Sequence, residues 1–130
     1  KNNNFAYDSF IKNRIKSNNI VINSNAKSVR NYMHPLDLCD WILRSFKFRK
    51  INIINTGGRD NLSLGHLAKI ISCFNYANLE KVKVKHLNYD EKENYVPDCI
   101  KAKELGLDAK ISINMQIEDS LNFYYNKIHD

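Results

Sequence analysis

The sequence predicts a small α/β domain, a mixed fold of short strands and several helices. Short runs of β-branched residues alternate along the chain with longer stretches whose apolar residues recur at helical spacing. The chain has 130 residues, of which 43% are hydrophobic, and this is enough for one core. We therefore expect a single domain over residues 1–130, with about three to five short strands.

The first half of the chain predicts two helices and two strands. Residues 5–16 place apolar side chains at helical spacing, and residues 19–23 form a short β-branched run. Residues 29–33 predict a second strand, in which Arg30 and Tyr32 share one face because side chains alternate. Pro35 suits the first turn of a helix, which we expect to run to about residue 48.

The second half continues the same alternation. Residues 51–56 predict a strand that ends at a Gly-Gly pair, and Ser63 is placed to cap the helix that follows. Residues 82–86 alternate strictly, as in a half-exposed strand. A helix after Pro97 is expected to stop at Gly106, and a strand-like turn and a helix end the chain.

Composition limits the partners and the compartment. Lys and Arg exceed Asp and Glu, 20 against 14, which gives a net charge of +6 and favours acidic partners such as nucleic acid, anionic lipid or phosphate-bearing ligands. The aromatic residues follow helix stripes instead of alternating with basic residues on a strand, so we do not expect a nucleic-acid partner.

Cysteine spacing and hydropathy point to a cytoplasmic chain without a membrane partner. The three cysteines are widely spaced, without a CxxC pair, which argues against a disulfide framework or a zinc site and fits a reducing cytoplasm. No apolar run approaches the length of a membrane span, and no leader peptide is recognisable. The opening residues, KNNN, favour a cut fragment of a longer protein.

Local chemistry shows no catalytic constellation. The Gly57-Gly58 pair lacks the residues of a phosphate loop or a dinucleotide fingerprint, so it predicts a tight turn. Arg30 is open to two interpretations. It is either a surface arginine paired with a carboxylate, or a phosphate clamp, since the guanidinium is a permanently charged planar fork of donors. His34 is more typical of a capping or packing residue than of an acid or base.

Five short motifs, taken in order, resemble a known family. They are Arg30 in its strand, PLDL at 35–38, INTG at 54–57, SLGHL at 63–67 and DCIKAKELG at 98–106. Together they resemble the C-terminal part of the extended short-chain dehydrogenases/reductases, the NAD-dependent nucleotide-sugar epimerases and dehydratases. The resemblance covers nearly the whole chain. It implies the substrate-binding cap of such an enzyme, without its Rossmann domain.

The resemblance also implies a nucleotide-sugar site. Arg30 would hold the pyrophosphate, and Val21 and Asn23 lie on the strand that would border the base. Asn88 stands at or near the place of a second phosphate-binding arginine. The nearby basic residues that could substitute for it are Lys85, His86 and Lys92. We expect Arg30 to be exposed in a concave face, with its guanidinium unpaired or holding an anion.

By the same resemblance, catalysis belongs to a missing N-terminal Rossmann domain, which would be a partner of this chain. That domain would carry the Tyr-x-x-x-Lys pair and bind NAD or NADP, so we expect no catalytic residue, cofactor site or metal site here. Residues 5–15 and the terminal helix, with Leu121, Phe123 and Tyr124, would then be left uncovered and cause self-association. The alternative is a free-standing, non-catalytic binding or regulatory module of the same fold.

Overall fold

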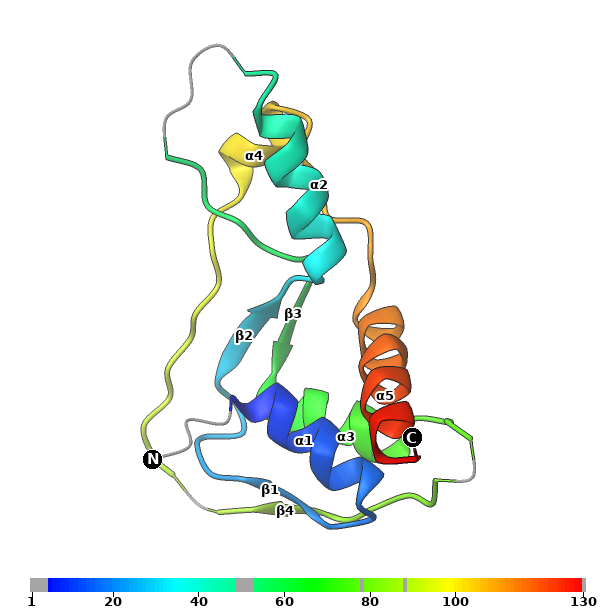
Figure 1. Ribbon diagram of the computed structural model, residues 1–130. Helices are drawn as coiled ribbons and strands as arrows, with labels where there is room; N and C mark the ends of the chain where they lie inside the picture. The colour runs from blue at the N-terminus through cyan, green and yellow to red at the C-terminus, as the bar shows by residue number, and fades with distance from the viewer. Residues whose placement is uncertain (1–4, 49–52, 78, 88, 130) are drawn as a thin grey trace.

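The computed structural model describes residues 5–48, 53–77, 79–87 and 89–129 (Figure 1). It confirms the small mixed α/β class. The elements in chain order are α1 (Ala6–Ile15), β1 (Ile20–Ile22), β2 (Val29–Tyr32), α2 (Pro35–Ser45), β3 (Asp60–Ser63), α3 (Leu64–Cys73), β4 (Val84–His86), α4 (Ile100–Glu104) and α5 (Ile113–His129).

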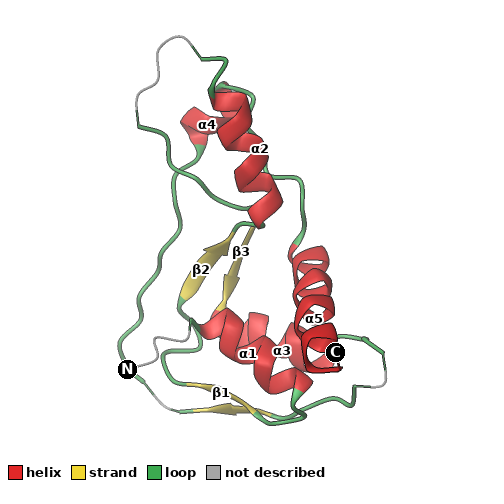
Figure 2. Ribbon diagram, in the orientation of Figure 1, coloured by secondary structure: helices red, strands yellow, loops and turns green. Residues whose placement is uncertain are grey.

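The described strands form two separate pairs. β1 and β4 are parallel, whereas β2 and β3 are antiparallel with Arg30 opposite Leu62. A single bridge joins Arg30 to Tyr95 on the other edge of β2. The β2–β3 pair connects the two ends of an elongated molecule (Figure 2).

One end of the molecule, which we call the body, consists of α1, α3, α5 and the β1–β4 pair. Its helices and β1 pack around a shared apolar core (Figure 1). The buried core residues are Phe10, Ile11, Ile20, Ile22, Leu64, Leu67, Ala68, Ile71, Ile113, Ile117 and Leu121. The body therefore buries most of the apolar faces of its own helices.

A buried arginine also holds the body together. Arg14, on the last turn of α1, is 1% exposed. Its guanidinium donates hydrogen bonds to the carbonyl oxygens of Ile71, Phe74, Leu79 and Glu80. The first two carbonyls belong to the end of α3, where a helix lacks internal donors and carries partial negative charge.

The other end, the distal lobe, consists of α2, α4 and the segments 53–59 and 105–109. The buried apolar residues of its cluster, in the part of the chain that the structure describes, are Trp41, Ala102 and Leu107. The opposite side of α2 presents large apolar side chains to solvent. These are Leu36, Ile42 and Leu43, and Phe46 directly after the helix is exposed as well.

The helix starts follow the predicted caps. Ser63 Oγ accepts a hydrogen bond from the His66 backbone nitrogen at the start of α3, and His34 Nδ1 accepts one from Leu36 at the start of α2. His34 is thus a capping residue, as predicted. Gly106 follows α4 with a φ of +76°, a conformation that favours glycine.

Three sequence predictions need correction. Residues 53–56 form no strand, because no described strand lies beside them to pair with; residues 51 and 52 lie outside the described part of the chain. α2 ends at Ser45, before residue 48. The segment before α5 is not a strand; the side chain of Asp60 accepts the backbone N–H of Ile113 there and fixes the helix start.

The expected uncovered face is also wrong in its location. Phe10 and Ile11 of α1 and Leu121 of α5 are buried in the core of the body, and Tyr124 is half-buried. α1 and α5 cover each other, which the sequence pattern of either helix could not show. Phe5, just before α1, and Phe123 on α5 are exposed as expected, but α2 has the larger group of exposed apolar side chains.

Candidate functional site

A cavity of about 810 Å³ lies where β2, the start of α1 and the start of α5 meet. Its wall includes Arg30 and Tyr32 from β2, Tyr7 and Asp8 from α1, and Gln116 from α5. The cavity therefore combines a permanent cation with several polar groups, in a volume typical of small-molecule sites.

The pairing of β2 with its neighbours fixes the direction of Arg30 and Tyr32. Asn31, on the opposite face, donates to the carbonyl oxygen of Gly58 and accepts a hydrogen bond from its nitrogen. A Cβ at Gly58 would lie 1.7 Å from the carbonyl oxygen of Tyr32, so only glycine permits this close approach. Arg30 and Tyr32 share a face of β2 because side chains alternate along a strand, and both line the cavity; Asn31 and Met33 also contribute to its lining.

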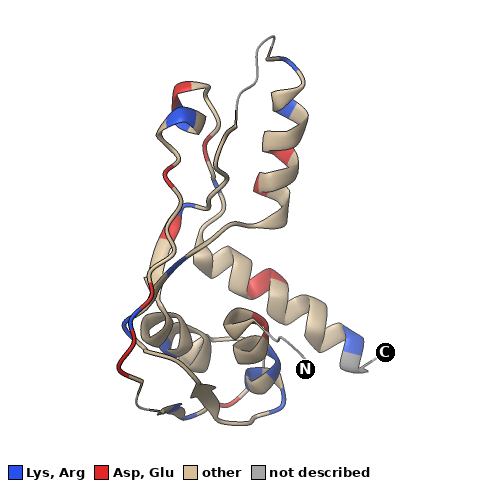
Figure 3. Cartoon of the chain, turned by 90° about the vertical axis from the view of Figure 1, so that its left-hand side faces the viewer, with Lys and Arg blue, Asp and Glu red and all other residues tan. Residues whose placement is uncertain are grey.

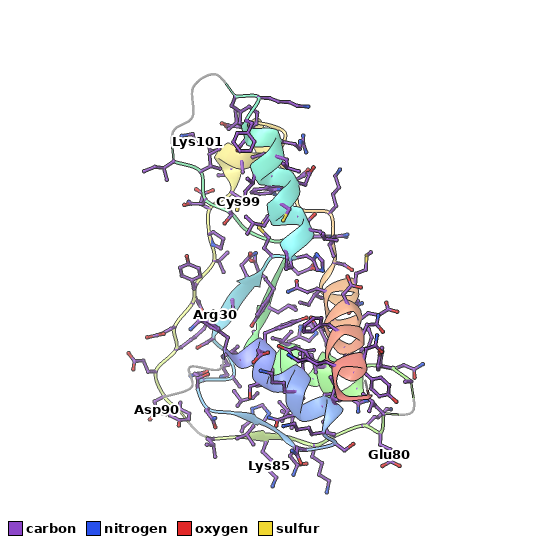
Figure 4. The ribbon with its side chains drawn as sticks, viewed as in Figure 1. Arg30, Glu80, Lys85, Asp90, Cys99 and Lys101 are labelled. Carbon is purple, nitrogen blue, oxygen red and sulfur yellow. The ribbon has the colours of Figure 1, made fainter. Side chains whose placement is uncertain are left out.

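Arg30 lies at the edge of the cavity, with its side chain 30% exposed. It extends from β2 toward the segment 90–97 (Figure 4). Its guanidinium donates to the carbonyl oxygens of Val29 and Glu93, and its Nη2 lies 3.5 Å from Glu93 Oε2. The prediction of an unpaired guanidinium is therefore wrong, because the partner comes from a segment distant in sequence.

The ion pair between Arg30 and Glu93 is nevertheless exposed to solvent and long. The Glu93 side chain is 71% exposed, and the 3.5 Å separation is long for a charge-assisted hydrogen bond. Exposed ion pairs of this kind contribute roughly 0–1 kcal/mol to stability. The Glu93 carboxylate therefore holds Arg30 weakly, whereas the carbonyl oxygens of Val29 and Glu93 hold its Nη1.

Two tyrosines form the inner wall. The ring centroids of Tyr7 and Tyr32 lie 5.8 Å apart. Burial raises the pKa of each phenol to about 12, so both are neutral near pH 7. The Tyr7 hydroxyl donates to the Gln116 carbonyl oxygen at 2.9 Å and lies 3.0 Å from Ser120 Oγ.

By contrast, two polar atoms of this wall lack a protein partner. The Tyr32 hydroxyl and Gln116 Oε1 are buried, and neither has a hydrogen-bond partner among the described residues. Strand alternation placed Tyr32 on the face of Arg30. No pattern in the sequence indicated Gln116 or Tyr7, because α1 and α5 meet β2 only in the folded chain.

The other predicted site residues lie elsewhere. Val21 and Asn23 line a smaller cavity of about 230 Å³ between β1 and α1. Ser24 lines both cavities, so the two adjoin. Asn88 lies outside the described residues. The possible substitutes Lys85, His86 and Lys92 are exposed and do not line either cavity.

Charged side chains and potential metal ligands are spread over the described chain. Basic and acidic residues are interspersed from one end of the molecule to the other (Figure 3). Within the described segments, no three His, Cys, Asp or Glu side chains come together as a metal site would require. None of the described helices is both long and apolar enough to cross a membrane.

Comparison with known proteins places the fold. No protein-family model and no curated protein matches the sequence. Similar solved structures include Pal from Bacillus thuringiensis, with 22% identity and a TM-score of 0.78 over 100% of this chain and 41% of that one. UDP-glucose 4-epimerase from Thermotoga maritima, determined with UDP-glucose, gives 18% identity and a TM-score of 0.77 over 95% of this chain and 40% of that one.

A dehydratase gives the same result. dTDP-glucose 4,6-dehydratase from Bacillus anthracis, in complex with NAD, has 13% identity and a TM-score of 0.79 over 96% of this chain and 40% of that one. The chain has the fold of part of an NAD-dependent epimerase or dehydratase. It spans about 40% of the length of these structures, which fits the C-terminal part expected from the sequence motifs.

Proposed function

We propose that this chain binds a nucleotide sugar, as the C-terminal substrate-binding part of an NAD(P)-dependent sugar-nucleotide epimerase, dehydratase or reductase. The observation that carries the proposal is Arg30, a permanent cation at the edge of an 810 Å³ cavity. The fold is shared with an epimerase determined with UDP-glucose. A pyrophosphate is the part of such a ligand that a guanidinium binds best.

Arg30 would exchange one anion for another. In the free chain its guanidinium interacts with the exposed carboxylate of Glu93. A diphosphate carries more charge and offers oxygens for a two-pronged contact, so it would replace that carboxylate. The base would then extend toward Val21 and Asn23 in the adjoining cavity.

Catalysis would come from a Rossmann domain that holds NAD or NADP. The exposed apolar side chains of α2 support the presence of such a partner, because an apolar face of this kind usually marks an interaction surface. Three free cysteines, two of them exposed, support a reducing cytoplasm as the site of action.

Titration of the 130-residue chain with UDP-glucose, followed by NMR chemical shifts, tests the proposal. We expect weak binding, because the rest of the pocket would belong to the partner domain. Arg30→Met should weaken it by about tenfold or more, since a charge-assisted contact is lost. Lys85→Met removes the same charge from exposed β4 and should change affinity by less than about twofold. Equal affinities for wild type and Arg30→Met would contradict the role of Arg30.

A free-standing binding or regulatory module remains the second candidate. The observation that favours it is the body, where eleven of the described residues form a buried core within this chain. The coding sequence upstream of Lys1 separates the two candidates. A Rossmann-encoding stretch in frame supports the enzyme part, whereas a stop codon directly upstream supports the module.

A further inference from the structure

The segment 53–56 of the distal lobe has the composition of a strand but no strand beside it. It reads Ile-Ile-Asn-Thr, and among the described residues none of its backbone N–H or carbonyl groups is hydrogen-bonded to another backbone group. Ile53 is 89% exposed, so the segment lies at the surface. Unpaired backbone groups in a run of β-branched residues are a template for pairing with a strand of another chain.

The side chains of this segment alternate as they do in a strand. Ile54 and Thr56 line a cavity of about 210 Å³ beside α2, whereas Ile53 and Asn55 line another of about 410 Å³ beside α4. One helix of the lobe therefore lies on each face of the segment. Since side chains occupy the two faces, the backbone groups at its edges are left for a neighbouring strand.

Both helices leave apolar side chains exposed along the segment. Ile42 of α2 is 50% exposed and Ile100 of α4 is 65% exposed, and each lines the cavity on its own side. A helix with its side chains is about 10 Å across, about twice the spacing of 4.8 Å between strands. Each helix is therefore wide enough to cover a second strand, and such a strand would bury backbone groups and apolar side chains together.

The charges around the segment favour a second copy of this chain as the source of that strand. The wall beside α4 contains Lys101 as well as Asp98 and Glu104. A surface with both signs can meet itself with opposite charges facing each other, whereas a partner of one sign would be repelled by part of it. An antiparallel pair of identical segments also has the two-fold symmetry of the commonest homo-oligomers.

We propose that two copies of the 130-residue chain pair through the segment 53–56 as antiparallel strands. The two copies of α2 then lie on one face of this strand pair, and the two copies of α4 lie on the other. The residues that line the two cavities beside the segment do not include any that line the cavity at Arg30. The pairing is therefore independent of the proposed nucleotide-sugar site, and it gives the self-association of the chain a defined geometry.

Proline substitutions and sedimentation equilibrium test this pairing. Neighbouring N–H groups of a strand point to opposite edges, so Asn55→Pro and Thr56→Pro each remove the donor from a different edge. The wild-type chain should dimerise at high concentration, and one of the two proline variants should raise the dissociation constant of the dimer by about tenfold or more. Asn55→Ala and Thr56→Ala keep the N–H group and, as matched controls, should dimerise like the wild type. A monomeric wild type, or two proline variants that dimerise as well as the wild type, would overturn the proposal.

Hydrogen exchange of the wild-type chain gives a second measurement that needs no variant. The amides of residues 53–56 should exchange about tenfold more slowly, or slower still, at a concentration where the dimer forms than in dilute solution, because strand pairing protects the donors of one edge. Equal exchange at the two concentrations, in a chain that does dimerise, would mean that the copies meet through the side chains of α2 alone. That result would overturn strand pairing.

Discussion

The body and the distal lobe are built from similar amphipathic helices but differ in how they are covered. Among the described residues, eleven are buried in the core of the body and three in that of the lobe. α1 packs against both α3 and α5, whereas α2 leaves Leu36 and Leu43 in solvent. A hydrophobic pattern thus identifies the apolar face of a helix, but it does not show whether the partner for that face belongs to the same chain.

The body and the lobe also differ in how their backbone polar groups are paired. In the body, the guanidinium of Arg14 satisfies carbonyl groups at the end of α3. In the lobe, the segment 53–56 pairs with no described strand, and Ile53 is 89% exposed. Asp37 on α2 is buried and accepts the backbone N–H groups of Lys110 and Ile111, just before α5. His34, at the start of α2, places its Nε2 3.2 Å from Asp119 Oδ2 on α5.

The largest expected effect is a loss of stability of the body. Arg14→Met should lower the free energy of unfolding by about 3–5 kcal/mol, because buried carbonyl groups lose their donors. Urea unfolding followed by circular dichroism measures this loss. Lys16→Met, two residues later at the exposed C-terminal end of α1, should leave the midpoint almost unchanged. Similar midpoints for the two variants would show that the Arg14 hydrogen bonds are not needed.

A matched pair of leucines tests the comparison directly. Leu67→Ala in the body removes a side chain that is 0% exposed and should cost about 2–5 kcal/mol. Leu43→Ala in the lobe removes one that is 67% exposed and should change stability by less than about 0.5 kcal/mol. Urea midpoints of both variants give the result. A loss at Leu43 comparable to that at Leu67 would mean that the α2 face is covered within the chain.

The exposed face of α2 should also govern association of the isolated chain. We expect the chain to self-associate at high concentration, and Leu43→Glu with Phe46→Glu should shift it toward the monomer in sedimentation. Phe123→Glu is the control on α5, and it should leave association unchanged. If only Phe123→Glu formed monomers, the chain would associate through α5 and not through the exposed side of α2.

The smallest effect concerns acid stability of the body. Burial raises the pKa of Asp8, but hydrogen bonds from Lys12 and Tyr124 outweigh it, so the pKa lies below its ordinary value. A lowered pKa means that this stabilisation is present above the unfolded-state pKa and is lost as pH falls through the folded-state pKa. Asp8→Asn should therefore flatten the decline of the thermal midpoint below about pH 4. If the thermal midpoint of Asp8→Asn falls as steeply in acid as that of the wild type, Asp8 makes no such contribution.

Local patterns in the sequence predicted much of the fold. Pro35 and Ser63 marked the starts of α2 and α3, and strand alternation placed Arg30 and Tyr32 on one face. These features depend on neighbours within a few residues. The motif order likewise led to the epimerase/dehydratase resemblance, which the solved structures confirm at the level of fold.

What could not be predicted depends on contacts between distant segments. Arg30 meets Glu93, 63 residues away, and Gln116 reaches the same cavity from α5. Residues 53–56 have the β-branched composition of a strand but no neighbouring strand in the described chain. Periodicity and capping contain no information about such pairings.

Native-state hydrogen exchange of the isolated chain tests the central claim, that the body is complete and the distal lobe is not. We expect the slowest amides of α1, α3 and α5 to exchange only with global unfolding. Those of α2 and α4 should exchange through local opening, at a free energy lower by about 2 kcal/mol or more. Protection of α2 equal to that of α3 would contradict the account, because the lobe would then be as self-sufficient as the body.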